Sequence, residues 1–116
     1  MKWSEQMRVL LSEDEHYNQL LYDLDGGRLY INGEMIAKAD SITSEGRELT
    51  ITYDKFTEII KKYPFFTDIK FLLNCIFMWN SGTYISYQKP ISVSKYNNYY
   101  ELYNSELSAT LNIYFK

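Results

Sequence analysis

Histidine and cysteine each occur only once in the chain, as His16 and Cys75. A Ser-His-Asp or Cys-His pair would have to use this one histidine, and no nucleophile can be placed beside it from the sequence. Glu13 and His16 form a single Glu-x-x-His half-motif, whereas a carboxylate di-metal site needs two copies. Cys75 stands in an apolar run and is expected to be a small buried hydrophobic residue. The sequence therefore predicts no enzyme, no metal site and no cofactor.

Long apolar runs are also missing. The longest, near Phe71 to Trp79, is broken by Asn74, and the first eleven residues contain one acid and an arginine where a signal peptide needs apolar residues. We therefore expect a cytoplasmic protein that does not enter a membrane. With 116 residues, 46% of them hydrophobic and 23% charged, the chain is expected to form a single domain, residues 1–116.

Basic residues are few and scattered. The net charge is −3, and the excess of acid lies in residues 1–54, which carry eleven acids and five bases. A protein that binds nucleic acid normally gathers Lys and Arg on one face, because neutralising phosphates supplies most of the affinity. Nucleic acid is therefore an unlikely partner.

Two helices are expected. Apolar residues recur at helical spacing over residues 4–24, and Gly26 suits the left-handed position that ends a helix. A capping-box pattern that starts at Ser12 would instead divide this segment into two short helices. A second, short helix is expected to begin at an Asp54 cap and to end at Pro64.

The strongest strand signal is the hairpin of residues 28–31 and 34–38 around Asn32-Gly33, a dipeptide that favours a type I′ turn. In such a hairpin Leu29 would face Ile36 across the strands. Alternating apolar residues over 48–53 predict a third strand that completes a meander.

Residues 69–79 fit both a helix and a strand, and their aromatic and β-branched content favours a buried central strand. Alternation and turn residues predict further strands near 83–88, 91–96, 98–104 and 107–115. The expected fold class is α+β, with a mainly antiparallel sheet of six to eight strands and both helices packed on one of its faces.

Tyrosine is the most over-represented residue, with 12 copies. Residues 94–104 combine four Tyr with three Asn, the residue types that antigen-binding loops use for contact area and adaptable hydrogen bonds. The ordinary alternative is a strand pair whose rings pack across the strands. The candidate binding residues in this segment are Tyr96, Asn97, Asn98, Tyr99, Tyr100 and Tyr103.

A second candidate patch is the acidic run Glu13, Asp14 and Glu15. Such a run can attract a basic partner through charge complementarity, although it can equally be a solvated helix face.

These features favour a small acidic protein that binds another protein, with a basic surface, and inhibits it. A toxin immunity protein or a phage-encoded anti-defence protein directed at a nuclease would have this character. The alternative is a module that binds single-stranded nucleic acid by stacking exposed Tyr rings on bases. A homodimer is also possible, because a Tyr-rich edge strand can pair with its own copy.

Overall fold

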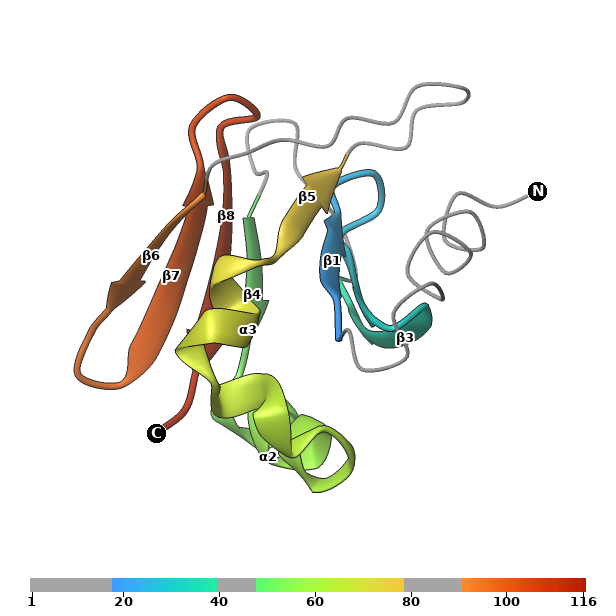
Figure 1. Ribbon diagram of the computed structural model, residues 1–116, viewed down its shortest axis with the longest axis vertical. Coiled ribbons are helices and arrows are strands. Elements are labelled where there is room, and N and C mark those ends of the chain that lie inside the picture. The colour runs from blue at the N-terminus through green and yellow to red at the C-terminus, as the bar shows by residue number, and fades with distance from the viewer. Residues whose placement is uncertain (1–17, 40–47, 79–90) are drawn as a thin grey trace.

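The computed structural model describes residues 18–39, 48–78 and 91–116. Within these residues eight strands form two four-stranded sheets of mixed strand direction (Figure 1). Sheet A has the order β3-β2-β1-β5 and sheet B has the order β4-β8-β7-β6. Sheet A contains β1 (Leu20–Asp23), β2 (Arg28–Ile31), β3 (Glu34–Lys38) and β5 (Ile76–Met78). Sheet B contains β4 (Glu48–Ile51), β6 (Ser92–Lys95), β7 (Tyr99–Asn104) and β8 (Ala109–Tyr114).

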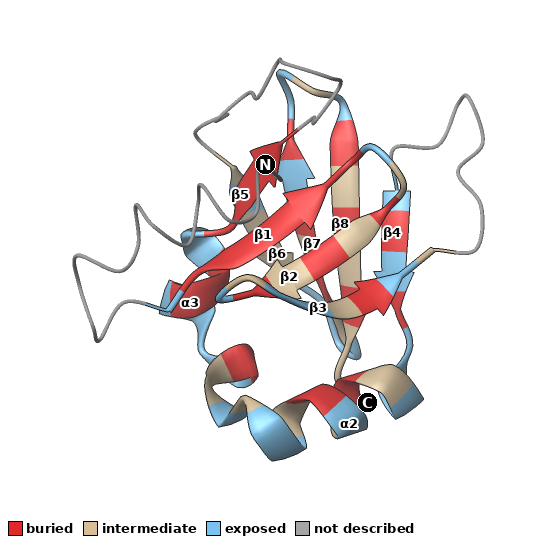
Figure 2. Ribbon diagram, turned by 90° about the vertical axis from the view of Figure 1, so that its right-hand side faces the viewer, coloured by how far each residue is buried: buried red, intermediate tan, exposed pale blue. Residues whose placement is uncertain are grey.

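The α+β class is confirmed, and four of the six pairings among the described strands are antiparallel, but the strands form two sheets instead of the expected single one. Two helices, α2 (Tyr53–Lys62) and α3 (Ile69–Leu73), join the sheets, with the short 3-10 helix η1 (Pro64–Thr67) between them. Both sheets and both helices contribute to one buried apolar cluster (Figure 2). Its members include Tyr22 and Leu29 from sheet A, Leu102 and Leu111 from sheet B, and Phe66 from η1.

The end of the expected N-terminal helix is in fact a strand, β1, and residues 4–17 of that prediction lie outside the described part of the chain. Strand β1 pairs with β2 in the antiparallel and with β5 in the parallel direction, so it lies inside the sheet. All four of its residues are buried. A strand buried on both faces has no alternation to distinguish it from a buried helix, which explains the error.

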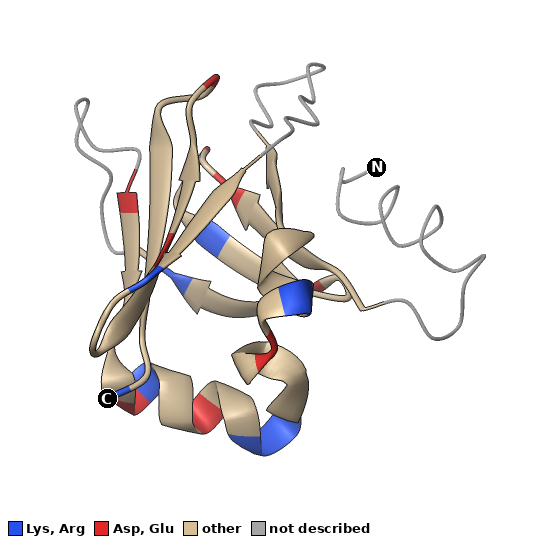
Figure 3. Ribbon diagram, turned by 60° about the vertical axis from the view of Figure 1, so that its left-hand side comes forward, with Lys and Arg blue, Asp and Glu red and all other residues tan. Residues whose placement is uncertain are grey.

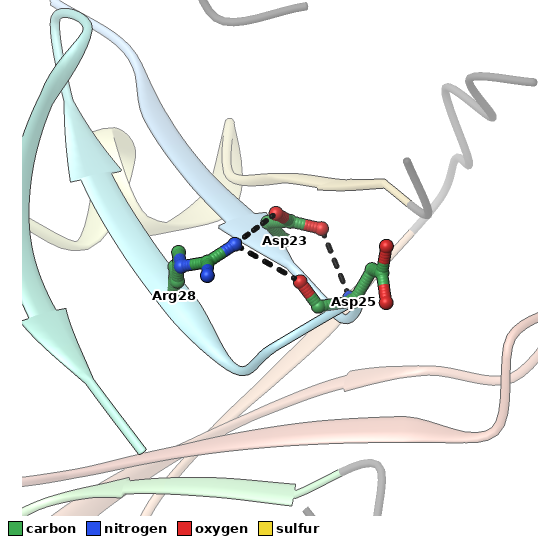
Figure 4. A network of polar contacts seen from close by, with 3 residues as sticks. All are labelled: Asp23, Asp25 and Arg28. Atoms are coloured by element: carbon green, nitrogen blue, oxygen red, sulfur yellow. Dashed lines mark hydrogen bonds and ion pairs between the residues drawn. The ribbon is translucent and has the colours of Figure 1, made fainter. Parts of the chain in front are cut away.

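The turn between β1 and β2 explains Gly26, which was expected to end a helix. Gly26 and Gly27 have φ angles of 103° and 62°, positive values that glycine adopts more readily than other residues. Asp23 Oδ1 accepts a hydrogen bond from the Asp25 N–H at 2.9 Å, and Arg28 Nη1 lies 3.9 Å from Asp23 Oδ2 (Figure 4). The two glycines therefore form part of the turn between β1 and β2. The buried carboxylate of Asp23 is held in this turn by the Asp25 N–H and by Arg28.

The expected hairpin is confirmed. Asn32 and Gly33 have φ angles of 52° and 85°, as a type I′ turn requires. Its register differs from the prediction, because Leu29 pairs with Ala37 and Tyr30 pairs with Met35. This leaves Ile36 as the extra residue of a bulge, so it does not face Leu29.

The expected three-stranded meander is wrong. Strand β4 does not join the hairpin but runs parallel to β8 in sheet B, where Leu49 pairs with Leu111 and Ile51 with Ile113. The alternation in β4 was interpreted correctly, since Leu49 and Ile51 are buried while Glu48 and Thr50 are exposed. Alternation fixes which side chains face the core but does not identify the neighbouring strand.

Helix α2 buries Phe56 and Ile59, as expected from its spacing. Its cap is Thr52 instead of Asp54, because Thr52 Oγ1 accepts a hydrogen bond from the Lys55 N–H at 3.3 Å. Pro64 follows the helix and occupies the first position of η1, where its missing N–H costs nothing.

The strand favoured for residues 69–79 is wrong for its first half, where Ile69–Leu73 form helix α3, and right for Ile76–Met78, which form the buried strand β5. The strands expected near 91–96, 98–104 and 107–115 are confirmed as β6, β7 and β8. The strand expected at 83–88 lies outside the described residues.

Candidate functional site

The outer surface of sheet B carries four tyrosines. Alternation along β7 sends Tyr100 and Leu102 into the core and leaves Tyr99, Glu101 and Tyr103 on the opposite side. On β8, Tyr114 lies on this outer side, because it pairs with Tyr99. We define the tyrosine face as Tyr96, Tyr99, Tyr103 and Tyr114 together with Glu48, Glu101 and Asn112.

Three of these rings stack in a row across the strands. The ring centroids of Tyr96 and Tyr99 lie 4.7 Å apart at an interplanar angle of 18°, and those of Tyr99 and Tyr114 lie 4.8 Å apart at 21°. Neighbouring strands are about 4.7–4.9 Å apart, so the pairing of β7 with β8 sets the spacing between Tyr99 and Tyr114. The backbone therefore holds the row in place, with Tyr99 at its centre.

The turn between β6 and β7 brings Tyr96 into the row. The Tyr96 N–H donates to the Tyr99 carbonyl at 2.8 Å, and Asn97 and Asn98 form the exposed tip. The Asn98 carbonyl accepts a hydrogen bond from the Phe115 N–H at 3.0 Å, which ties the turn to the end of β8. Asn97 and Asn98 thus lie next to the row of stacked tyrosines, on one continuous surface.

Exposure varies along the tyrosine face. Tyr96 is 46% exposed and Tyr103 is 38% exposed, while Tyr99 and Tyr114 are half-buried by their neighbours. Partial desolvation of the Tyr99 hydroxyl, followed by the effects of Tyr96 and Glu101, raises its pKa. The Tyr99 side chain therefore stays a neutral phenol at physiological pH and can donate and accept hydrogen bonds.

The charges on the tyrosine face are acidic. Glu101 lies between Tyr99 and Tyr103 along β7. Glu48 of β4 pairs with Thr110 of β8, which places it on the same side of sheet B. Figure 3 shows where the acidic residues lie along the chain. The ammonium of Lys95 is directed elsewhere, because it lies 5.9 Å from the ring centroids of both Tyr100 and Phe115. The described part of this face therefore combines phenols with carboxylates.

Tyr100 does not belong to the candidate surface. It is only 9% exposed, and its ring packs against Phe115 at 4.9 Å. Its inclusion among the binding residues followed from treating the whole Tyr-rich segment as a surface, whereas strand alternation places it in the core. The acidic run Glu13, Asp14 and Glu15 lies outside the described residues.

Tyr114 and the two glutamates of the tyrosine face were not predicted as site residues. The signal for Tyr114 was present, since it alternates with Ile113 in the expected strand at 107–115. Its place beside Tyr99 depends on the pairing of β7 with β8, which single-sequence patterns do not specify.

Other site types find little support in residues 18–39, 48–78 and 91–116. They contain no group of three or more His, Cys, Asp or Glu side chains arranged to hold a metal ion. No helix among them has the length and apolar character that crossing a membrane requires. Burial raises the pKa of the Cys75 thiol, which keeps it in the unreactive protonated form.

Comparisons of the chain with protein-family models, with curated proteins and with solved structures gave no match.

Proposed function

We propose that the protein binds another protein through the tyrosine face and thereby inhibits it. The observation that carries this proposal is the row of Tyr96, Tyr99 and Tyr114, stacked at 4.7 and 4.8 Å and continued along β7 by Tyr103. Tyr side chains provide large, rigid and amphipathic contact area at low entropic cost. Rings already fixed against one another lose still less freedom when a partner binds.

The partner is a protein with a basic surface. Glu48 and Glu101 lie among the rings, while the ammonium of Lys95 is drawn toward Tyr100 and Phe115 on the other side of the sheet. Charge complementarity speeds association with a positive surface and disfavours acidic partners. A nuclease is one class of protein with such a surface, because it must bind phosphates.

Inhibition follows from how such a face acts. A partner that binds the tyrosine face has part of its own surface covered. If the covered part is the basic, phosphate-binding surface, substrate is excluded. A toxin immunity protein or an anti-defence protein would act in this way.

The second candidate function is binding of single-stranded nucleic acid by base stacking. The partly exposed rings of Tyr96 and Tyr103 support it, because bases can stack on exposed aromatic rings. Two observations weaken it. Both sides of the Tyr99 ring are occupied by Tyr96 and Tyr114, so a base cannot stack on it. Glu48 and Glu101 would also repel phosphates. The protein-binding function is therefore the better supported of the two.

Site-specific photo-cross-linking tests the proposal in a lysate of the source organism. A photoreactive phenylalanine analogue replaces Tyr103 in one sample and Leu73, which is 50% exposed on α3, in the control. We expect one dominant protein adduct from position 103 and none of that mass from position 73. Adducts of equal yield at both positions would refute a specific role for the tyrosine face.

The captured partner is then purified and titrated against matched variants by calorimetry. Central aromatic contacts in interfaces contribute at least about 2 kcal/mol, so Tyr103→Ser and Tyr96→Ser should each weaken binding by about 30-fold. Leu73→Ser should leave the affinity unchanged. A parallel titration with fluorescent oligonucleotides at two salt concentrations would favour the second function if binding were tight and fell steeply with salt.

A further inference from the structure

A cleft separates the edge of sheet A from helix α2. It has a volume of about 200 Å³. Strand β3 contributes Glu34, Met35 and Ile36 to its lining, and α2 contributes one helical face that includes Ile59, followed by Tyr63 at the C-cap of the helix. In Figure 2, α2 lies alongside β3 on the side that faces away from β2. Among the described residues β3 pairs only with β2, so the cleft lies along the outer edge of β3, and it lies on the other sheet from the tyrosine face.

The main-chain groups of Met35 point away from β2. In a type I′ turn the carbonyl of Ile31 accepts a hydrogen bond from the N–H of Glu34, so these two residues form a hydrogen-bonded pair. Antiparallel pairs alternate between hydrogen-bonded and non-hydrogen-bonded types. The next pair, Tyr30 and Met35, is therefore of the second type, which directs the N–H and C=O of Met35 away from β2.

The bulge limits how much of β3 is offered to a ligand. It inserts Ile36 between the residues that pair with Tyr30 and Leu29, so the register shifts there before the pairing continues at Leu29–Ala37 and Arg28–Lys38. Bulges bend an edge strand and interrupt its pairing with further strands. The segment on the turn side of the bulge, residues 34–36, is also the segment that lines the cleft.

The cleft is apolar at its floor and balanced in charge at its rim. Met35 is 51% exposed, and Ile36 and Ile59 lie beside it. Lys62 Nζ lies 2.8 Å from Glu34 Oε2. The other rim charges, Lys55 and Glu58, pair at 3.5 Å. Two ammonium groups are thus matched by two carboxylates, so the cleft favours an uncharged ligand.

We propose that the β3 edge binds an extended, uncharged segment of a partner protein by strand addition. The ligand backbone hydrogen-bonds to the N–H and C=O of Met35, and one of its apolar side chains enters the cleft against Ile36 and Ile59. Only an extended peptide offers a donor and an acceptor at the spacing of a strand edge, and a neutral cleft selects an apolar side chain. This site is independent of the function proposed for the tyrosine face.

A phage-displayed library of random dodecapeptides, enriched on the purified full chain, tests the proposal. Met35→Pro removes the outward N–H, which an edge strand tolerates, while Met35→Thr shortens the side chain but keeps the N–H. We expect enriched peptides with an apolar core to bind the wild type and Met35→Thr, and to lose about tenfold or more in affinity for Met35→Pro. Tyr103→Ser should retain full affinity, which separates this site from the tyrosine face.

A methylation scan of the strongest peptide provides the second measurement. N-methylation at successive residues should weaken binding with a period of two, because alternate N–H groups of an added strand face the protein. Four outcomes would overturn the proposal. The first is that no peptide is enriched, the second is that peptides bind Met35→Pro and the wild type with equal affinity, and the third is a methylation scan without a period of two. The fourth is that Met35→Pro does not fold, because the N–H of Met35 would then belong to the ladder with β2. A dimer that dissociates in Met35→Pro would instead identify the occupant as a second copy.

Discussion

The row of stacked tyrosines predicts a specific pattern of energetic coupling. Tyr99 contacts two rings, Tyr96 at 4.7 Å and Tyr114 at 4.8 Å, whereas each of the outer rings contacts one. A stacked aromatic pair contributes about 0.5–1.5 kcal/mol beyond the area that it buries. Removing the central ring therefore abolishes two such contributions, and removing an outer ring abolishes one.

Threonine is the appropriate replacement, because it retains a high preference for strands while removing the ring. We expect Tyr99→Thr to lower the free energy of unfolding by about 1–3 kcal/mol through lost stacking, and Tyr96→Thr or Tyr114→Thr by about half as much. Double-mutant cycles should give coupling energies of about 0.5–1.5 kcal/mol for the pairs Tyr96–Tyr99 and Tyr99–Tyr114. The two outer rings should couple by less than about 0.5 kcal/mol.

Urea unfolding followed by circular dichroism measures these free energies in all single and double variants. Tyr103→Thr is the matched control, since Tyr103 lies on the same strand and face but outside the row. If the coupling energy between Tyr96 and Tyr114 were as large as that of the pairs that include Tyr99, the three rings would not form a stacked row. The same conclusion would follow from a loss for Tyr99→Thr no greater than that for Tyr103→Thr.

Three further predictions concern the core and its turns. Asn32→Gly keeps the positive φ but removes the side-chain oxygen that accepts the Gln19 N–H at 2.8 Å, so urea unfolding should show a loss of about 1–3 kcal/mol; unchanged stability would contradict it. Burial, with a smaller effect of Glu48, raises the pKa of Tyr22 above its ordinary value of 10.0, so the unfolded state loses this proton first. Stability should therefore fall as the pH rises above 10.0, and less steeply in Tyr22→Phe, as denaturation at a series of alkaline pH values will show. Cys75, which is 2% exposed, should react with a thiol reagent only as fast as the protein opens, and rapid reaction without denaturant would exclude its burial.

Local chemistry was sufficient to predict the elements whose signals lie within a few residues. The Asn32-Gly33 turn needs positive φ at both positions, and this requirement fixed the hairpin before any neighbour was known. Helix α2 was found from the spacing of Phe56 and Ile59. The tyrosine segment was correctly interpreted as a turn with flanking strands.

The elements that were missed depend on contacts distant in sequence. Strand β1 is a strand because it lies between β2 and β5, and the latter is more than fifty residues away along the chain. The parallel pairing of β4 with β8 likewise joins distant segments. Apolar pattern specifies burial but not the partner strand, so the division into two sheets could not be derived from it. The same limit hid Tyr114, whose role depends on the register with Tyr99.

The burial of sheet A explains why the two proposed surfaces differ in kind. Its outer side carries a second apolar cluster of Leu21, Ile76 and Met78, each at most 9% exposed, so the centre of that face is closed to a partner. What sheet A offers is the edge of β3, where recognition depends on main-chain groups and tolerates many sequences. On the outer side of sheet B, Tyr103 is exposed and Tyr99, Glu101 and Tyr114 are partly exposed, so recognition there depends on the side chains of the tyrosine face and is therefore selective. Substitutions on the tyrosine face should thus change which partner is bound. Met35→Pro should instead weaken the binding of every extended ligand to the same degree. Measuring the affinities of selected peptides with unrelated sequences tests this difference.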